Sequence, residues 1–470
     1  MLTLSPLLGV LLACSEPDKG LGSAATTDTD PVGADTSADD TSADDTADTD
    51  APASALVFTG ERPTNLLMIS WDTTRADRLQ RYGGGPEMDT VEALFAGGVA
   101  LDNHRSCSSW TWASVVCAMT GASDVEQGYI PTSHEDYLGN APDALLWGSE
   151  VLRDQGYQTA LVATNSWFSA DVNMSQGFQH EAYDWGGKAD WSTAAALGFF
   201  EDGVLDPAEP WYLHVHYMDP HIAYKPPEGY RSEVDGLPEL ADYDLEAKPG
   251  YWDLEEAWAG LDADTRALAW EHLDARYRGE LAYTDDQLAL LLDELGALGA
   301  LEDTLIVFWT DHGEQLLEHG SVGHGNSLFE EENRALAAFS APGLAPQPWS
   351  GPTTHQDLWP TTLDALGLPA PSSWTGLPVG AREPDAHRFA LRHDGAADRV
   401  LQFVERGGSK LIYSWSGEKA LYRIGDDPGE LNDRYDPEDS EVIALWSLLG
   451  PEVEAVEAVH PSWTPIDPNP

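Results

Sequence analysis

The sequence predicts an α/β fold: a large, mostly parallel sheet sandwiched by helices, followed by a small C-terminal antiparallel sheet plus a helix. From residue 62 onward, short apolar runs alternate with segments of helical periodicity, which is typical of a parallel sheet. Near residue 385 the pattern changes to a succession of short strands. The composition, with 42% hydrophobic residues and 18 tryptophans, is sufficient for a sizeable core.

The strands of the large sheet are the clearest elements. We expect the first at 65–71, NLLMISW, because this apolar run is bounded by Pro63 and Asp72. WYLHVHY at 211–217 alternates as a strand does, and TLIVFWTD at 304–311 is a second buried strand. The other expected elements are helices near 88–97, over 143–156, 265–298 and 355–367 and near 440–449, and strands over 159–164, 388–393, 400–406, 409–415 and 420–425.

The chain is strongly acidic. It has 81 acidic and 24 basic side chains, a formal net charge of −57, and nine of the aspartates lie in residues 28–50. Such a surface repels nucleic acid and anionic lipid headgroups, so no nucleic-acid partner is expected. The charge suits a salty or calcium-containing medium, and a lysine-poor or halotolerant host would explain it equally well.

The N-terminal region predicts export and anchoring. Residues 1–14 end in LLAC and resemble a lipoprotein signal peptide in which Cys14 is lipidated, although no Lys or Arg precedes the apolar run. The alternatives are an uncleaved signal or a misplaced start. Residues 15–60 contain a repeated TSADD and almost no large apolar side chains, which predicts an acidic disordered tether. We therefore expect an exported protein, lipid-anchored in the bacterial cell envelope at the outer membrane or the periplasmic face.

Carboxylates and imidazoles follow three of the expected strands. Asp72 ends the first, Asp311 and His312 end the strand at 304–310, and His221 follows the strand at 211–217. Ligands of parallel sheets bind at the carboxyl ends of strands, and two aspartates with a histidine form a plausible divalent-metal site. Taken singly, Asp72 could equally be a helix N-cap and Asp311-His312-Gly313 a turn.

Several of these segments together resemble the sulfatase family of the alkaline-phosphatase superfamily. The resemblance covers roughly residues 62–435. It rests on PTNLLMISWDTTRADRL (63–79), GYQTALVATN (156–165), HYMDPHIAYKPP (216–227), the long stretch 280–343 that includes TDHGEQ and GHG, HQDLWPTTLDALGLP (355–369) and ALYRIGDDPGELND (420–433). The resemblance implies a sulfatase-like catalytic domain over 62–384 and a small α+β subdomain over 385–470.

The resemblance also assigns the site residues. The family's nucleophile lies ten residues before the glycine of a Thr-Gly pair, here Gly121, which gives Thr111 in SSWTWASVVCAMTG. Thr111 would begin a helix, whose free N–H groups favour an anion. The implied catalytic residues are Thr111, His221 and His324, and the implied metal ligands are Asp72, Thr111, Asp311 and His312.

The chain departs from the family pattern at several positions. Sulfatases oxidise a Cys or Ser at the nucleophile position to formylglycine, which a threonine cannot form, so no formylglycine is expected. Ala113 and Val115 stand at the positions of a Pro and an Arg, and Thr164 and Ser166 at those of a Lys and a His. Thr73 replaces a second metal-adjacent Asp. Basic groups expected around the anion are therefore missing.

These observations favour a metal-dependent hydrolase of sulfate or phosphate esters in which Thr111 attacks and one divalent ion, calcium or else manganese or zinc, assists. The substrate would be a small-molecule, glycan or lipid ester. The alternatives are a catalytically degenerate protein that binds such a ligand and a phosphotransferase. The pair Cys107 and Cys117 is open between a disulfide and two buried thiols.

Overall fold

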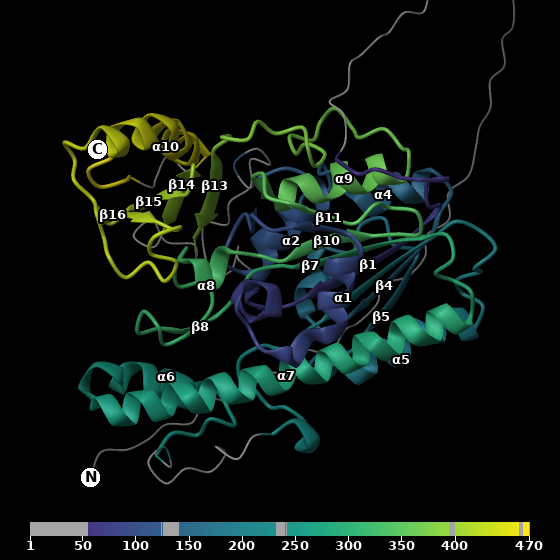
Figure 1. Cartoon of the computed structure of the whole chain (residues 1–470), viewed down its shortest axis with the longest axis horizontal. Coiled ribbons are helices and arrows are strands. Elements are labelled where there is room, and N and C mark those ends of the chain that lie inside the picture. The colour runs from purple at the N-terminus through teal and green to yellow at the C-terminus, as the bar shows by residue number, and fades with distance from the viewer. Residues whose placement is uncertain are drawn as a thin grey trace, which may run out of the picture. The chain divides into compact units, whose positions relative to one another are not determined.

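The centre of the fold is an eight-stranded sheet in the order β11-β2-β10-β7-β1-β6-β4-β5 (Figure 1). The computed structural model describes residues 55–469 apart from 124, 126–140, 232–239, 241, 394–399 and 460–463. The strands are β1 (Asn65–Trp71), β2 (Val99–Leu101), β4 (Gln158–Ala163), β5 (His180–Tyr183), β6 (Trp211–Tyr217), β7 (Thr304–Thr310), β10 (Ala337–Ser340) and β11 (Gln347–Trp349).

Strand β1 lies in the middle of this sheet, parallel to both neighbours. Its register pairs Leu66 with Tyr212 of β6 and with Leu305 of β7. Strand β10 is antiparallel to β7 and β2, whereas β4, β5 and β11 pair in parallel. The predicted α/β class with a mostly parallel sheet is confirmed, and the carboxyl ends of β1, β4, β6 and β7 meet at one edge.

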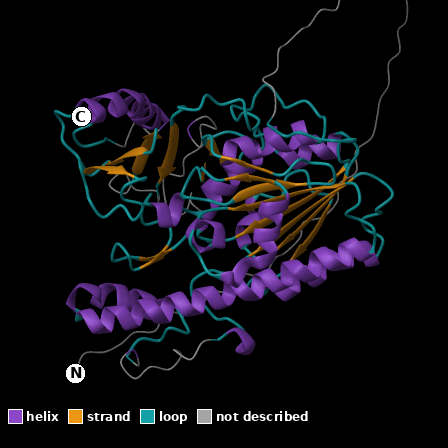
Figure 2. Ribbon diagram, in the orientation of Figure 1, coloured by secondary structure: helices purple, strands orange, loops and turns teal. Residues whose placement is uncertain are grey.

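Each face of the sheet carries its own apolar core. Along β1, Leu67, Ile69 and Trp71 pack into one core, and Leu66 and Met68 into the other, as the alternation of a strand requires. The first core is covered by α1 (Asp89–Gly97), α5 (Ala189–Glu201) and the long α7 (Ala263–Ala297). The second is covered by α2 (Thr111–Thr120), α4 (Gly148–Asp154) and α9 (Leu358–Ala365). The helices enclose the sheet on both sides (Figure 2).

The C-terminal part is a four-stranded antiparallel sheet with one helix, as expected. Its strands are β13 (Arg388–Arg392), β14 (Leu401–Arg406), β15 (Ser409–Ser414) and β16 (Lys419–Arg423), and α10 (Ser440–Val459) packs on it. The smaller elements are α6 (Lys248–Ala257), α8 (Glu330–Asn333), β3 (His104–Arg105), β8 (Gln315–Leu316), β9 (Val322–Gly323) and β12 (Thr353–Thr354).

Three predicted boundaries are wrong. The helix expected from residue 143 begins at Gly148, where the Glu150 carboxylate accepts a hydrogen bond from Trp147 N at 3.2 Å and caps the first turn. Helix α10 passes through Pro451 to Val459 because its second half packs into the same apolar core. The expected tether ends before residue 60, since Leu56 is buried and residues 55–60 pair with the fold.

Two predictions of the N-terminal region lie outside the described residues. These are the signal peptide with Cys14 and the tether over residues 15–54. Within the part of the chain that is described, none of the helices combines the length and the apolar character that crossing a membrane requires.

Candidate active site

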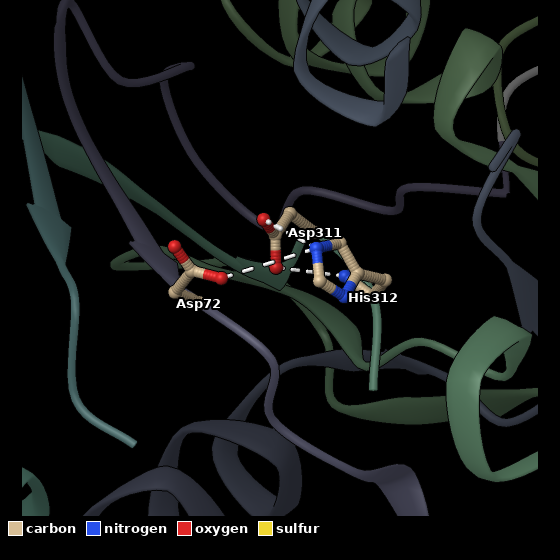
Figure 3. A group of neighbouring side chains, drawn as sticks. All are labelled: Asp72, Asp311 and His312. Carbon is tan, nitrogen blue, oxygen red and sulfur yellow. Dashed lines mark hydrogen bonds and ion pairs between the residues drawn. The ribbon is translucent and has the colours of Figure 1, made fainter. Parts of the chain in front are cut away.

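Two aspartates and a histidine converge at the carboxyl ends of the two central strands. Asp72 follows β1, and Asp311 and His312 follow the adjacent β7. All three side chains are fully buried, and one ligand atom from each lies within 4.8 Å of the others. Figure 3 shows the three side chains turned towards one another. The sequence placed these residues together, and the structure does so.

One oxygen of each carboxylate in this triad accepts hydrogen bonds, and the other faces His312 Nε2, at 3.3 Å for Asp311 Oδ2 and 3.9 Å for Asp72 Oδ1. Asp311 Oδ1 accepts from Thr73 N at 3.0 Å and from His312 N at 2.8 Å, and Asp72 Oδ2 accepts from Asn165 Nδ2 at 2.5 Å. Asp72 Oδ1 and Asp311 Oδ2 are buried without a hydrogen bond. Because buried charged oxygens are costly unless they are paired or coordinate a metal, the donor set fits a divalent cation.

Burial also sets the protonation of these groups. It lowers the pKa of His312 to about 3, so the imidazole is neutral, as a metal ligand must be. Burial and the neighbouring Asp72 charge raise the pKa of Asp311. Two carboxylates this close favour the arrival of a positive charge between them.

A buried hydrogen-bonded chain lies behind Asp72. Ser70 Oγ forms hydrogen bonds with His214 Nε2 at 2.8 Å and with His216 Nδ1 at 2.9 Å. His216 Nε2 in turn lies 3.5 Å from Asp72 Oδ2. His216 and Asn165 were not predicted as partners of the site, although both lie near or just after a strand end, where the carboxyl-edge rule would have found them.

Thr111 lies beside the triad as the first residue of α2. Its side chain is buried, and its Oγ1 is 3.3 Å from His312 Nε2. One turn later, Ser114 Oγ donates to Asp311 O at 2.5 Å and forms a hydrogen bond with His355 Nδ1 at 3.0 Å. These contacts fix the start of the helix on the end of β7, so the hydroxyl of Thr111 lies against His312 of the triad.

A disulfide between Cys107 and Cys117 links the segment before α2 to the helix itself. This resolves the alternative that the sequence left open. On the same helix, Ala113 and Val115 are fully buried in the second apolar core. The position at which the resemblance implied an arginine is therefore occupied by packed hydrocarbon.

Two histidines complete the immediate surroundings. The ring centroid of His324 lies 4.6 Å from that of His312 and 5.0 Å from that of His221. His324 Nδ1 contacts Glu314 Oε1 at 2.9 Å, and Tyr224 donates its hydroxyl to Glu314 Oε2 at 2.6 Å. Burial opposes protonation of His324, but the hydrogen bond and charge of Glu314 outweigh it and raise its pKa. Burial lowers the pKa of His221 to about 3.

The loop that carries His324 is fixed by its two glycines. Gly323 and Gly325 have φ angles of 87° and 71°, a region that residues with a Cβ seldom adopt. Gly325 N donates to Ser109 O at 2.8 Å, which ties this loop to the segment before α2. The Gly-His-Gly sequence thus places His324 next to Thr111.

Thr111, His221 and His324 border a cavity of about 260 Å³. The lining residues are Thr111, Thr164, Asn165, Ser166, Trp167, Trp185, Gly186, Met218, His221, Lys248 and His324. All three predicted catalytic residues are among them. Thr73 does not line this cavity, and its hydroxyl donates a hydrogen bond to Pro220 O. Lys248 was not predicted, since no sequence motif marks it.

Fold and site together define a class. The chain is an α/β protein with a buried Asp-Asp-His cluster that could hold a metal ion at the carboxyl edge of its sheet, next to a hydroxyl at the start of a helix. The comparison with known sequences makes this specific: the sequence model named Sulfatase matches residues 64–368, more than half of the 470-residue chain. The chain therefore belongs to the sulfatase family.

The curated relatives are distant. The chain is 27% identical over 258 residues to a choline-sulfatase of Rhizobium meliloti (strain 1021), a match covering 47% of this chain and 46% of the relative. It is 23% identical to an arylsulfatase of Clostridium perfringens, covering 62% of each chain. These matches span less than two thirds of either relative. With the uncharacterized sulfatase YidJ of Escherichia coli (strain K12), identity is 23%, covering 80% of this chain and 84% of the relative.

Solved structures confirm the fold. The structure of BT4656 in complex with D-glucosamine-2-N,6-O-disulfate matches with a TM-score of 0.66 and 19% identity, covering 86% of this chain and 99% of that one. The phosphonate monoester hydrolase SpPMH from Silicibacter pomeroyi matches with a TM-score of 0.65 and 17% identity, covering 84% of this chain and 95% of that one.

Proposed function

We propose that this protein is a metal-dependent hydrolase of sulfate or phosphate esters in which Thr111 is the nucleophile. The observation that carries the proposal is the position of Thr111 Oγ1, buried 3.3 Å from His312 Nε2, which clusters with the carboxylates of Asp72 and Asp311. The Thr111 hydroxyl and the imidazoles of His221 and His324 share one cavity, and Thr111 also contacts His312 of the buried triad. Membership of the sulfatase family supports the ester class.

Each residue has a role in this proposal. Asp72, Asp311 and His312 would hold the divalent ion, which when bound draws charge from the ester oxygens and favours the ionised hydroxyl. Thr111 Oγ1 loses its proton to solvent and attacks the phosphorus or sulfur atom, so that a bond to Thr111 forms and the bond to the leaving oxygen breaks. His324, oriented by Glu314 through Nδ1, gives a proton to that oxygen. Water then cleaves the threonine ester and restores the hydroxyl.

The residue types favour phosphate over sulfate. A threonine carries a methyl on Cβ and cannot become the aldehyde on which sulfatases depend, so a direct oxygen nucleophile remains, as in phosphoryl transfer. The fold likeness to a phosphonate monoester hydrolase agrees with this assignment. The likeness to a structure that binds a disulfated glucosamine leaves sugar esters within the substrate class.

The test is a paired assay of aryl sulfate, aryl phosphate and aryl phosphodiester with calcium, manganese or zinc. We expect metal-dependent turnover of a phosphoester, abolished in Thr111→Ala and Asp311→Asn. Thr120→Ala, at the other end of α2, and Asp303→Asn, at the other end of β7, are the matched controls and should retain activity. Metal binding without turnover of any ester would instead identify a ligand-binding protein, and transfer to an added alcohol would identify a phosphotransferase.

We further propose that Cys14 is lipidated and anchors an exported protein in the cell envelope. The support is the LLAC sequence followed by an acidic, apolar-poor segment. Metabolic labelling with an alkyne fatty acid in a bacterial host tests this proposal. Label is expected on the wild-type protein and lost in Cys14→Ala, and an unlabelled wild-type protein would refute the proposal.

A further inference from the structure

One wall of the active-site cavity has no part in the chemistry proposed above. It contains Lys248, Trp167 and Trp185, which line the same space as Thr111. They come from different segments: Lys248 begins α6, Trp167 follows β4 and Trp185 follows β5. These three side chains are available to contact a substrate in the cavity.

The backbone of Lys248 is held by the helix that it begins, and its side chain is exposed. Tyr251, one turn later, is fully buried, and its hydroxyl accepts a hydrogen bond from Tyr224 N at 3.0 Å. Beyond the effect of burial, the charge of Lys248 contributes to the low pKa of His221 and opposes the increase that Glu314 causes in the pKa of His324. The ammonium group of Lys248 and the two imidazoles line the same cavity.

The charge of Lys248 is exceptional in this cavity. Among the described residues that line it, Lys248 is the sole Lys or Arg, and no described carboxylate forms an ion pair with it. Thr164 and Ser166, where the family resemblance implied basic residues, line the same cavity and are uncharged. In a chain with a net charge of −57, an ammonium beside the cavity that pairs with none of the described carboxylates attracts an anion.

Trp185 gives this wall an exposed aromatic face. Its side chain is 79% exposed, the largest exposed fraction among the large hydrophobic side chains of the described residues. It lies at the carboxyl edge of the sheet, just after β5, with the half-buried Trp167 on the same cavity. An exposed indole beside a cavity is suited to stack on a flat ring of a ligand.

We propose that Lys248 and Trp185 form a substrate-recognition subsite: Lys248 binds the charged oxygens of the ester, and Trp185, with Trp167, stacks on a ring in the leaving group. This inference rests on the proposed function for the identity of the anion. It assigns the substrate class as sulfate or phosphate esters of ring-bearing alcohols, aryl or sugar. It also places the positively charged side chain of the site on α6 rather than on α2.

Equilibrium binding to the metal-loaded full chain tests the subsite without requiring turnover. The ligands are inorganic phosphate, methylphosphonate and phenylphosphonate, none of which has a cleavable ester, measured by calorimetry. We expect Lys248→Met to weaken all three by about tenfold to 100-fold, and Lys248→Arg to restore most of the affinity. Trp185→Ala should weaken phenylphosphonate by about threefold to tenfold and leave the other two unchanged.

Lys225→Met and Trp252→Ala are matched controls, because neither residue lines the cavity. Four results would overturn the subsite. The first two are unchanged affinities in Lys248→Met and an equal loss of affinity in Lys225→Met. The others are no binding of any of the three anions to the wild type, and a Trp185→Ala loss that is the same for ligands with and without a ring. A C-glycosyl phosphonate in place of phenylphosphonate tells a sugar ring from an aryl ring. If the binding pattern is as expected but no ester is hydrolysed, the proposed function fails while the subsite stands.

Discussion

Replacing Glu314 by Gln would remove a charge from the active site without changing its shape. The Glu314 side chain is fully buried, accepts the Tyr224 hydroxyl at 2.6 Å and contacts His324 Nδ1 at 2.9 Å. A glutamine can keep both contacts, but it no longer favours the positive imidazolium of His324. The substitution therefore tests whether His324 supplies the proton to the leaving oxygen.

The size of the effect follows from these contacts. A hydrogen bond to a charged group contributes about 1.5 to 3 kcal/mol, and each 1.4 kcal/mol corresponds to tenfold in rate. If that stabilisation acts in the transition state, Glu314→Gln lowers kcat/KM by about tenfold to 100-fold for an alkyl phosphate. For 4-nitrophenyl phosphate, whose leaving group departs without a proton, the decrease should be less than about threefold.

The assay compares both substrates in the wild type, Glu314→Gln and Tyr224→Phe. Tyr224→Phe is the control for packing, because it removes the hydroxyl contact but leaves the carboxylate charge and the His324 contact. It should lower both rates less than Glu314→Gln lowers the alkyl rate. Equal losses on the two substrates in Glu314→Gln, or none, would refute the role of His324 as proton donor.

Three further predictions concern the surroundings of the site. Asn165→Ala removes the 2.5 Å hydrogen bond to Asp72 and should weaken metal binding by about tenfold to 100-fold in calorimetry, and unchanged affinity would contradict this. In Gly148→Ala the new Cβ would overlap the indole of Trp359, so urea unfolding should show a loss of about 1 to 3 kcal/mol. Burial and the Asp219 charge raise the pKa of Glu280 to about 7, above its ordinary 4.5, so the folded state binds more protons between these values and stability should fall as pH rises. Glu280→Gln should make the free energy of unfolding depend less on pH. The same pH dependence of this free energy in the two proteins, measured by urea unfolding from pH 5 to pH 8, would refute the prediction.

The elements that the sequence predicted best are those buried on both faces. Strands β1 and β6 match their predicted bounds, and β7 ends one residue earlier, because a central parallel strand shows as a continuous apolar run. Strands β2, β10 and β11 were missed. They have three or four residues each, too few for a periodic signal. Their places in the sheet depend on pairing with distant segments.

The residues of the candidate site also divide into those that the sequence predicts and those that it does not. Asp72, Asp311 and His312 could be placed together because each follows a recognisable strand, and the strand-end rule brings such residues to one edge. The same rule would also have found His216, one residue before the end of β6, but it was not predicted. Lys248 could not be predicted, because it reaches the cavity through the packing of α6 and not through any spacing in the sequence.

The central position of β1 has a consequence for how the chain is made. It is the first strand of the sheet to be synthesised, yet its neighbour β7 pairs Thr304 with Asn65, 239 residues later. At a translation rate of about 5 to 20 residues per second, the apolar strand waits roughly 12 to 48 s for that partner. The cation site, which needs Asp72 from one strand and Asp311 from the other, cannot assemble on a nascent chain until the ribosome has passed His312. Strand β6 can pair with one edge of β1 before β7 is made, but the other edge stays unpaired until then, so a defect in factors that keep unfolded chains soluble should reduce the yield of this protein before it affects its turnover.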